Sequence, residues 1–512
     1  MSHPTNTAPE APTARNLPQA PPKARTGVDG LDDILAGGLN RGRVYLLESS
    51  PGTGKTTIAT QFLMEGERHG ERGLYITLSE TEIELRESAA SHGWTIRDPI
   101  AVFELVPPEN LLDDEQQQSL LYSSDLELGE TTMRIFEAIE QCQPTRVVLD
   151  SLSEIRLLAQ SSLRYRRQIL ALKHYFSKHG LTVLMLDDLT TEALDKTVHS
   201  VAHGVIRLEE MAADYGGERR RMRVIKYRGQ KYRGGFHDFV IDTGGMRIFP
   251  RLVSAEYVPD FKREPAKSGS PELDALLGGG IERGSSTLIL GPAGTGKSLL
   301  TLTFAAAAIA RGEKAAMFVF DEEQGLLIER ALGLGLDLQS MIDQGSLFLQ
   351  QIDAAELAPG EFAYRVKHCV ELFGARTVII DSLNGYQAAM PEEQQLILHM
   401  HELLQYLNRR GASTFLTVAQ HGLVGDMKAP IDVTYLADTV ILLRYFEAMG
   451  RIRRAISVIK KRTSAHEDTI REYRIHARGI TLGAPLTNFQ GVLRGVPELI
   501  YPSREPTEVP AA

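Results

Sequence analysis

Two glycine-rich loops hold most of the residues with which this chain could do chemistry. The second loop, GPAGTGKS at residues 291–298, matches the pattern G-x-x-x-x-G-K-[S/T]. In this pattern backbone N–H groups surround the phosphates of a nucleotide, the lysine neutralises the terminal phosphates and the hydroxyl binds Mg²⁺. The loop therefore predicts a nucleoside triphosphate site. Its expected contacts are Gly291, Gly294, Thr295, Gly296, Lys297, Ser298 and Leu299.

The first loop, SSPGTGKT at residues 49–56, has serine where the pattern begins with glycine. Its lysine, its hydroxyl residue and its inner glycines are retained, so we expect it to bind a nucleotide as well. The residues expected to contact that nucleotide are Ser50, Gly52, Thr53, Gly54, Lys55, Thr56 and Thr57.

Both loops belong to a longer repeat. Residues 27–95 align without a gap to residues 269–337, because Lys55 and Lys297 are 242 positions apart and so are the later acids Glu80 and Glu322. A constant spacing over a segment of this length indicates a duplicated domain rather than two chance motifs. We therefore predict a tandem nucleoside triphosphatase.

Short apolar runs that alternate with helical patterns must position these loops. In the first repeat the runs at 43–49, 73–78, 145–150 and 181–186 predict strands, and 165–180 has the apolar spacing of a helix. The second repeat has the same order of elements. This alternation predicts an α/β fold of two tandem domains, each a mostly parallel twisted sheet flanked by helices. In such sheets the ligand binds at the carboxyl ends of the strands.

An aspartate closes a later apolar strand in each repeat. Asp150 ends the run RVVLD and Asp381 ends TVIID, and each is followed by Ser-Leu. We expect each to hold Mg²⁺ together with a glycine-loop hydroxyl, Thr56 in the first site and Ser298 in the second. The alternative is that these aspartates are helix caps.

Hydrolysis also needs a group that orients or deprotonates water. Glu80 and Glu322 follow the second strand of each repeat, where such a group would lie. Asp321 precedes Glu322, whereas Ser79 occupies the matching position of the first repeat. We take Glu80, Asp321 and Glu322 as the candidate catalytic acids. Acids at the start of a surface helix are the alternative interpretation.

Composition limits the class of protein. The 512 residues fit two domains of about 250 residues each. The net charge of −10 argues against a general nucleic-acid coat, and two cysteines give neither a disulfide framework nor a metal cluster. No run approaches the ~18 apolar residues of a membrane span, and no signal peptide is recognisable. We expect a cytoplasmic protein that does not associate with membranes.

The polar, proline-marked segment 258–268 is the expected linker between a first domain at 25–257 and a second at 269–500. The ends of the chain, residues 1–24 and 501–512, are rich in Pro, Ala and Thr. This composition predicts disordered tails.

These motifs resemble those of the KaiC family of double RecA-like ATPases over about residues 25–500. The resemblance rests on TGVDGLDDILAGGL, both glycine loops, the acidic turns, the D-S-L strand ends and a late K-x-R motif in each repeat. It implies RecA-like P-loop domains that bind ATP and Mg²⁺ and stack as a two-tiered homo-hexamer. The basic residues that would reach the ATP of a neighbouring subunit are Lys226, Arg228, Lys460 and Arg462.

The resemblance also implies slow ATP hydrolysis in the first tier, a serine/threonine autokinase in the second, and KaiB-like or other signalling proteins as partners. The family's pair of acceptor hydroxyls is matched here by Thr434 and Tyr435, and a further family threonine is matched by Ala429. Thr434 is therefore the expected phosphoacceptor of a nucleotide-gated signalling or timing switch. The alternative is that Thr434 and Tyr435 are ordinary residues at the entry of a strand.

Two other functions fit parts of the sequence. The segment 217–236 combines Arg and Lys with Tyr, as in proteins that hold single-stranded nucleic acid, and would suit a DNA-dependent ATPase of the RecA superfamily. A K-x-R motif lies within this segment and gives the charge another role, so nucleic acid is not an expected partner. Ser49 and Ser79 would suit a nucleotide-gated scaffold that does not hydrolyse ATP. DNA-stimulated ATPase activity and salt-dependent DNA binding separate these alternatives.

Overall fold

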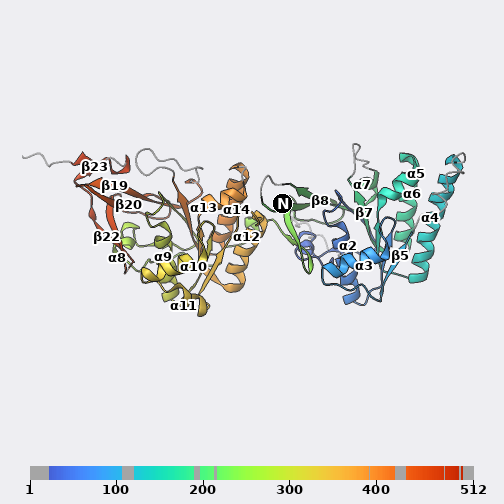
Figure 1. Ribbon diagram of the computed structural model, residues 1–512, viewed down its shortest axis with the longest axis horizontal. Coiled ribbons are helices and arrows are strands. Elements are labelled where there is room, and N and C mark those ends of the chain that lie inside the picture. The colour runs from blue at the N-terminus through green and yellow to red at the C-terminus, as the bar shows by residue number, and fades with distance from the viewer. Residues whose placement is uncertain are drawn as a thin grey trace, which may run out of the picture. The chain divides into compact units, whose positions relative to one another are not determined.

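The computed structural model describes residues 22–105, 120–189, 197–212, 216–390, 393–420, 434–477, 479–494 and 498–499. The chain divides into two compact units (Figure 1). The first contains the residues up to Glu210 and Arg220–Pro250, and the second contains Met211–Arg219 and the residues from Arg251 onward. Each unit has one large sheet covered by helices.

The sheet of the first unit has nine strands in the order β11-β10-β9-β8-β3-β7-β6-β4-β5. From β5 to β8 neighbouring strands pair in parallel, and β9, β10 and β11 add an antiparallel extension. The strand bounds are β3 Val44–Ser49, β4 Gly73–Thr77, β5 Ile100–Glu104, β6 Arg146–Asp150, β7 Thr182–Asp188, β8 Gly204–Met211, β9 Arg219–Tyr227, β10 His237–Asp242 and β11 Gly245–Phe249.

Helices cover both faces of this sheet (Figure 1). Helices α1 Leu31–Ile34, α2 Lys55–Arg68 and α3 Glu82–Ser91 pack on one face, and α4 Leu120–Cys142, α5 Leu152–Ala159, α6 Ser162–Lys178 and α7 Thr197–Val201 on the other. The central strand β3 is buried along its whole length. Burial on both faces explains why its sequence is a continuous apolar run rather than an alternating one.

The second unit repeats this plan with the strand order β16-β15-β17-β18-β14-β19-β20-β21-β22. The strand bounds are β14 Ser286–Gly291, β15 Lys314–Val319, β16 Leu347–Gln351, β17 Ala375–Asp381, β18 Ser413–Ala419, β19 Thr439–Ala448, β20 Arg451–Lys461, β21 Arg471–His476 and β22 Gly479–Pro485. Helices α8 Pro271–Leu276, α9 Lys297–Ala310, α10 Gln324–Gly333 and α11 Leu338–Asp343 cover one face; α12 Pro359–His368, α13 Leu383–Ala389 and α14 Glu393–Arg409 cover the other. The predicted fold class is confirmed.

The regions around the expected boundaries contain short elements. Strand β1 (Lys23–Ala24) pairs with β2 (Leu39–Asn40), so ordered structure begins inside the segment expected as a tail; residues 1–21 and 501–512 lie outside the described residues. Within the expected linker, β12 (Pro265–Ala266) pairs with β13 (Ile281–Glu282). In the described part of the chain, we find no helix with both the length and the apolar character needed to cross a bilayer.

Candidate nucleotide sites

The carboxyl ends of the parallel strands gather the predicted residues of the first site. Strand β3 pairs with β7 so that Ser49 lies opposite Asp188, and β4 pairs with β6 so that Thr77 lies opposite Asp150. The glycine loop, Asp150 and the acidic turn after β4 therefore share one edge of the sheet. This is the edge at which α/β sheets bind ligands.

The first glycine loop ends in a backbone conformation that favours glycine. Gly54 has a φ of 106°, and a Cβ there would lie 2.6 Å from Ile241 Cδ1. Helix α2 then begins at Lys55, so its N-terminal N–H groups face the position expected for phosphate. The Lys55 ammonium donates to the carbonyls of Ser49 and Ser50 at 3.4 and 3.2 Å.

The serine that replaces the first glycine takes part in this loop. Ser49 Oγ donates to the Ser50 carbonyl at 2.7 Å and accepts from Lys55 Nζ at 3.1 Å. In the second loop Lys297 Nζ donates to the carbonyls of the two equivalent loop residues at 3.0 and 2.9 Å. Both lysines therefore donate to the same two loop carbonyls, and Lys55 has the Ser49 hydroxyl as a further acceptor.

The second loop repeats the other features of the first. Gly296 has a φ of 97°, and a Cβ there would lie 2.6 Å from Ile475 Cδ1. Thr295 Oγ1 donates to the Pro292 carbonyl at 2.8 Å, and Thr53 makes the equivalent bond in the first loop at 2.9 Å. The other predicted contact residues lie in the two loops, at Gly52, Gly294 and Gly291, or in the first turns of α2 and α9, at Thr56, Thr57, Ser298 and Leu299.

Asp150 is buried and lies beside the hydroxyl expected to bind Mg²⁺. Tyr75 donates from its hydroxyl to Asp150 Oδ2 at 2.5 Å, and the Thr56 side chain lies close enough to the same phenol to oppose the rise of its pKa that burial causes. Burial raises the pKa of Asp150 to about 6, and neighbouring carboxylates add to the rise. A carboxylate and a hydroxyl around one point are the oxygen ligands that Mg²⁺ uses in nucleotide sites. The residues present fit the ion.

The second site offers the same pair of groups. Asp381 ends β17, accepts a hydrogen bond from Thr417 Oγ1 at 2.5 Å, and acts electrostatically on Lys297, whose pKa is lowered by burial and raised by this carboxylate. Ser298 follows Lys297 at the start of α9. The N-cap positions of the helices after β6 and β17 belong to serines that follow the two aspartates. The two aspartates thus lie one residue before the N-cap position, and neither serine side chain makes the capping hydrogen bond.

Glu80 lies in the turn between β4 and α3. Thr77 Oγ1 donates to the Glu80 carbonyl at 2.7 Å and accepts from its N–H at 3.0 Å. Thr81 and Glu84 form the capping box of α3, so the helix does not need the Glu80 side chain. Burial and the Glu84 carboxylate raise the pKa of Glu80, and the Lys55 ammonium opposes that rise. The Glu80 carboxylate is thus within electrostatic range of the glycine loop.

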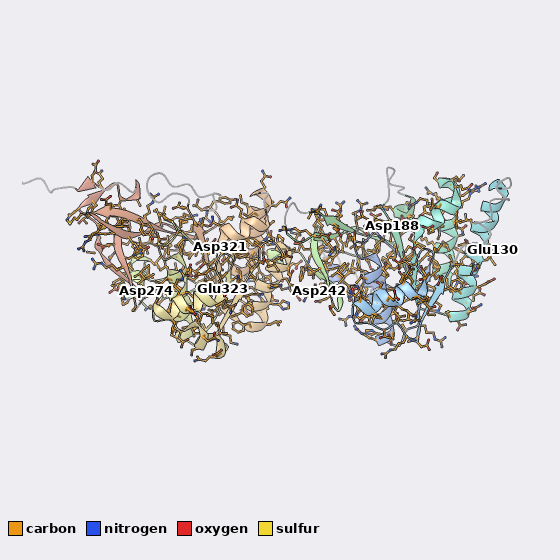
Figure 2. The ribbon with its side chains drawn as sticks, viewed as in Figure 1. Glu130, Asp188, Asp242, Asp274, Asp321 and Glu323 are labelled. Atoms are coloured by element: carbon orange, nitrogen blue, oxygen red, sulfur yellow. The ribbon has the colours of Figure 1, made fainter. Side chains whose placement is uncertain are left out.

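The acids of the second turn have different surroundings. Asp321, labelled in Figure 2, accepts a hydrogen bond from Ser382 Oγ, next to the strand end of β17. Glu322 forms an ion pair with Arg330 of α10 at 2.6 Å. Burial raises the pKa of Glu322, and Arg330 opposes the rise. Asp321 therefore contacts Ser382, the neighbour of the aspartate that we expect to hold Mg²⁺, whereas Glu322 is held by an exposed arginine.

In the second unit the K-x-R motif and Thr434 lie at the edge of the sheet opposite the glycine loop. Lys460 Nζ donates to the carbonyls of Thr434 and Ala437, both at 2.9 Å. The end of β20 is paired with Thr439, which lies opposite Thr287 at the start of β14. The glycine loop follows the other end of β14. Ala429, the match of a further family threonine, lies outside the described residues.

The first unit has the same arrangement. Lys226 Nζ donates to the carbonyl of Ala202 at 2.8 Å, and the Arg228 guanidinium donates to that of Ser200 at 2.9 Å. Backbone bonds link Arg228 through His203 to the first residue of β3. Each K-x-R motif is therefore far from the glycine loop of its own unit.

Two residues beside the glycine loops were missed from the sequence. Asp188 forms an ion pair with Lys55 at 2.6 Å. Arg454 of β20 lies over the ring of Tyr445, whose hydroxyl donates to the Ala293 carbonyl in the second loop at 3.4 Å. The two acids that end the run LMLDD are a signal that could have indicated Asp188. The arginine-rich segment around Arg454 offers no such signal.

Comparison with known proteins agrees with this geometry. A family profile described as "ATPase: KaiC" matches residues 24–253 and 266–486. The circadian clock protein KaiC3 of Synechocystis sp. is 30% identical over 484 residues, which cover 93% of this chain and 94% of the relative. The circadian clock oscillator protein KaiC of Synechococcus elongatus is 29% identical over 504 residues, covering 96% and 94% of the two chains. That of Parasynechococcus marenigrum is 28% identical over 492 residues, covering 93% of each. Since the profile covers both nucleotide sites, the chain belongs to the KaiC family of ATPases.

Proposed function

We propose that both units bind Mg-ATP and that the first accounts for most of the hydrolysis. One observation carries this proposal. In each unit a glycine-loop lysine is held by two loop carbonyls at the same edge of the sheet as a buried aspartate. The first site adds Glu80, a carboxylate with no hydrogen bond or ion pair of its own among the described side chains. Bound Mg²⁺ would supply charge stabilisation of the phosphates, held by Thr56 with Asp150 and by Ser298 with Asp381.

In this proposal the chain's own groups bind and orient the reactants. Lys55 and the N–H groups of the first glycine loop hold the β- and γ-phosphates, and Glu80 accepts a hydrogen bond from the attacking water and turns its oxygen toward phosphorus. Transfer to water gives ADP and inorganic phosphate. In the second site, Glu322 is engaged by Arg330, which supports slower hydrolysis there.

We also infer that each ATP lies between two subunits of a homo-oligomer, six being the number that the family resemblance implies. Strand β14 has 6 residues, and at about 3.3 Å per residue it separates the glycine loop from the K-x-R edge by roughly 20 Å. Lys460 and Arg462 are thus too far away to contact the nucleotide of their own unit. A neighbouring copy that presents this edge to the loop would bring them to the triphosphate, and Lys226 and Arg228 would do the same in the first tier.

Thr434 is proposed as an acceptor for the nucleotide of the neighbouring second unit. It lies at the same edge as Lys460 and is partly exposed. The γ-phosphoryl group would pass from ATP to Thr434 Oγ1, leaving ADP, while the hydroxyl proton passes to a carboxylate such as Asp321. Such a phosphate would add roughly −1.5 to −2 charges at a subunit boundary and so could act as a switch. KaiB-like or other signalling proteins are the partners that such a switch would address.

The basic segment at 217–236 does not favour the alternative of a DNA-dependent motor. Arg220 pairs with Glu210 at 3.0 Å, and Arg221 pairs with Glu209 at 2.9 Å. Lys226 is bound to backbone carbonyls. Much of the positive charge is therefore already compensated within the unit.

One experiment tests hydrolysis and phosphorylation together. Purified protein is incubated with Mg-ATP labelled at the γ-phosphate, and both free phosphate and label retained on the protein are measured. Release without retained label identifies an ATPase without a kinase activity; neither signal identifies a scaffold. Mass spectrometry of the peptide from Ala429 to Arg444 then locates the modification, and an unmodified peptide in a labelled protein excludes Thr434.

A further inference from the structure

The lysine of the first glycine loop has an acidic partner that approaches it from the next strand. Lys55 Nζ lies 2.6 Å from Asp188 Oδ1, and the lysine side chain is only 8% exposed. Asp188 ends β7 (Figure 2). Ser153 Oγ donates to its other oxygen at 3.3 Å, which fixes the carboxylate toward the loop. The ion pair is thus a partly buried contact whose carboxylate is held by Ser153, not a pairing of two mobile surface side chains.

The second unit lacks this partner. Strand register places Ser49 opposite Asp188 in the first unit and Gly291 opposite Ala419 in the second. Asp188 and Ala419 are therefore equivalent positions, one with a carboxylate and the other with a methyl group. Among the described contacts, Lys297 is bound only to backbone carbonyls.

This difference bears directly on phosphate binding. The ammonium of a glycine-loop lysine is the group that neutralises the β- and γ-phosphates. In the first unit the Asp188 carboxylate already forms an ion pair with the Lys55 ammonium. A triphosphate that reaches Lys55 must displace this carboxylate or share the ammonium with it. The carboxylate also repels negative charge at the site, as shown by its contribution to the raised pKa values of Glu80 and Asp150.

We propose that Asp188 is an internal competitor of the triphosphate for Lys55, and that it weakens ATP binding at the first site. Asp188 is a positioning residue, since it touches the lysine rather than the nucleotide. The inference rests on the proposed function of the first loop as an ATP site.

The test measures each site separately in the full chain, with the non-hydrolysable analogue Mg-AMP-PNP as ligand. Lys297→Ala isolates the first site and Lys55→Ala isolates the second. In the Lys297→Ala background, Asp188→Asn and Asp188→Ala should each tighten binding on the order of tenfold, because one charge-assisted contact no longer competes. In the Lys55→Ala background, Ala419→Asp should weaken binding by a similar factor.

The matched control removes one negative charge elsewhere in the first unit. Glu130 is exposed on α4 and is labelled apart from Asp188 in Figure 2, and Glu130→Gln should leave both affinities unchanged. The isosteric Asp188→Asn separates charge from shape. If a background variant fails to fold by circular dichroism, a two-site isotherm of the chain with both lysines intact gives the same comparison.

Unchanged or weaker binding after Asp188→Asn, with measurable binding in the parent, would overturn the competition while leaving the proposed function intact. Tightening by Asp188→Ala alone would assign the effect to space rather than charge and would also overturn it. No binding at the first site, with or without Asp188, would instead reject the proposed function of that loop.

Discussion

At the scale of single residues, Glu80 is the group on which hydrolysis is expected to depend. Glu80→Gln removes the charge that orients water but no contact of the glycine loop, so phosphate release should fall roughly 100-fold while nucleotide affinity stays within about twofold. Steady-state phosphate release and analogue binding measure the two quantities. Glu322→Gln is the matched change in the second site and should cost less; a larger loss from Glu322→Gln would reverse the assignment of roles.

A half-buried histidine in the second unit should make the stability of that unit depend on pH. His399 of α14 is hydrogen-bonded to the Tyr386 hydroxyl at 2.8 Å, and burial lowers its pKa from 6.5 to about 4. Above pH 6.5 the imidazole is neutral in both the folded and the unfolded protein. As the pH falls from 6.5 toward 4, the unfolded chain gains a proton that the folded unit does not, so up to about 3 kcal/mol of stability is lost.

Chemical denaturation of the full chain between pH 7 and 4 measures this loss. His399→Gln cannot titrate and should flatten the pH dependence of the second unit. His401→Gln, on the exposed side of the same helix, serves as the control and should keep the parental slope. Equal slopes for the parent and His399→Gln would show that other groups set the acid sensitivity.

How far single residues can be predicted depends on whether their partners are close in sequence. The glycine loops were predicted with their lysines because all the groups that define them are contiguous. The contact of Asp188 with the glycine loop was missed because it depends on the register of β7 against β3. This register places Asp188 opposite a loop residue that is over a hundred positions away in the sequence. The serine at position 49 departs from the glycine-loop pattern in the sequence; its hydrogen bonds to Ser50 and Lys55 appear only in three dimensions.

At the scale of elements, the antiparallel strands close over the glycine loops and make glycine necessary there. Gly54→Ala would combine a left-handed φ with a Cβ 2.6 Å from Ile241 of β10. Gly70 has a φ of 72° and open space around it, so Gly70→Ala costs only the strain of a left-handed backbone conformation. We expect Gly54→Ala to destabilise the first unit by about 1–3 kcal/mol more than Gly70→Ala. Similar losses of stability for the two variants in thermal unfolding would mean that β10 moves to accommodate the added methyl group.

The apolar strands were predictable as elements, whereas the antiparallel extension was not. Strand β6 reads as a continuous apolar run because it is buried on both faces, and its aspartate stands out at the end. Strand β9 is arginine-rich and partly exposed, so its sequence looks like a charged surface segment. Lys226 and Arg228 lie at one edge of the sheet because of the direction in which their strand runs. Local composition does not indicate this direction.

At the scale of the whole molecule, the duplication was readable but the divergence between the units was not. Glu48 in the first unit is buried and bonded to Arg207 and His199, both at 2.7 Å. The equivalent pair in the second unit, by strand register, is Leu290 and Leu442. An ionic cluster and an aliphatic contact thus fill the same place in one fold. The repeat fixes backbone geometry, and the two sites are free to acquire different electrostatics.

The same duplication leads to the prediction of an ATP-dependent ring. Each K-x-R motif is remote from its own loop, so in the proposed assembly the nucleotide contacts are completed by a neighbouring copy. Bound ATP should then stabilise the assembly by mass action. Six copies of 56.6 kDa give about 340 kDa, the mass expected from light scattering in saturating Mg-ATP. The double change of Arg228→Ala and Arg462→Ala should shift assembly to higher ATP concentration, whereas Arg97→Ala, which removes an arginine that is 76% exposed, should not. A monomeric mass in saturating Mg-ATP would reject assembly, and an assembly that forms equally without ATP would reject the nucleotide as its bridge.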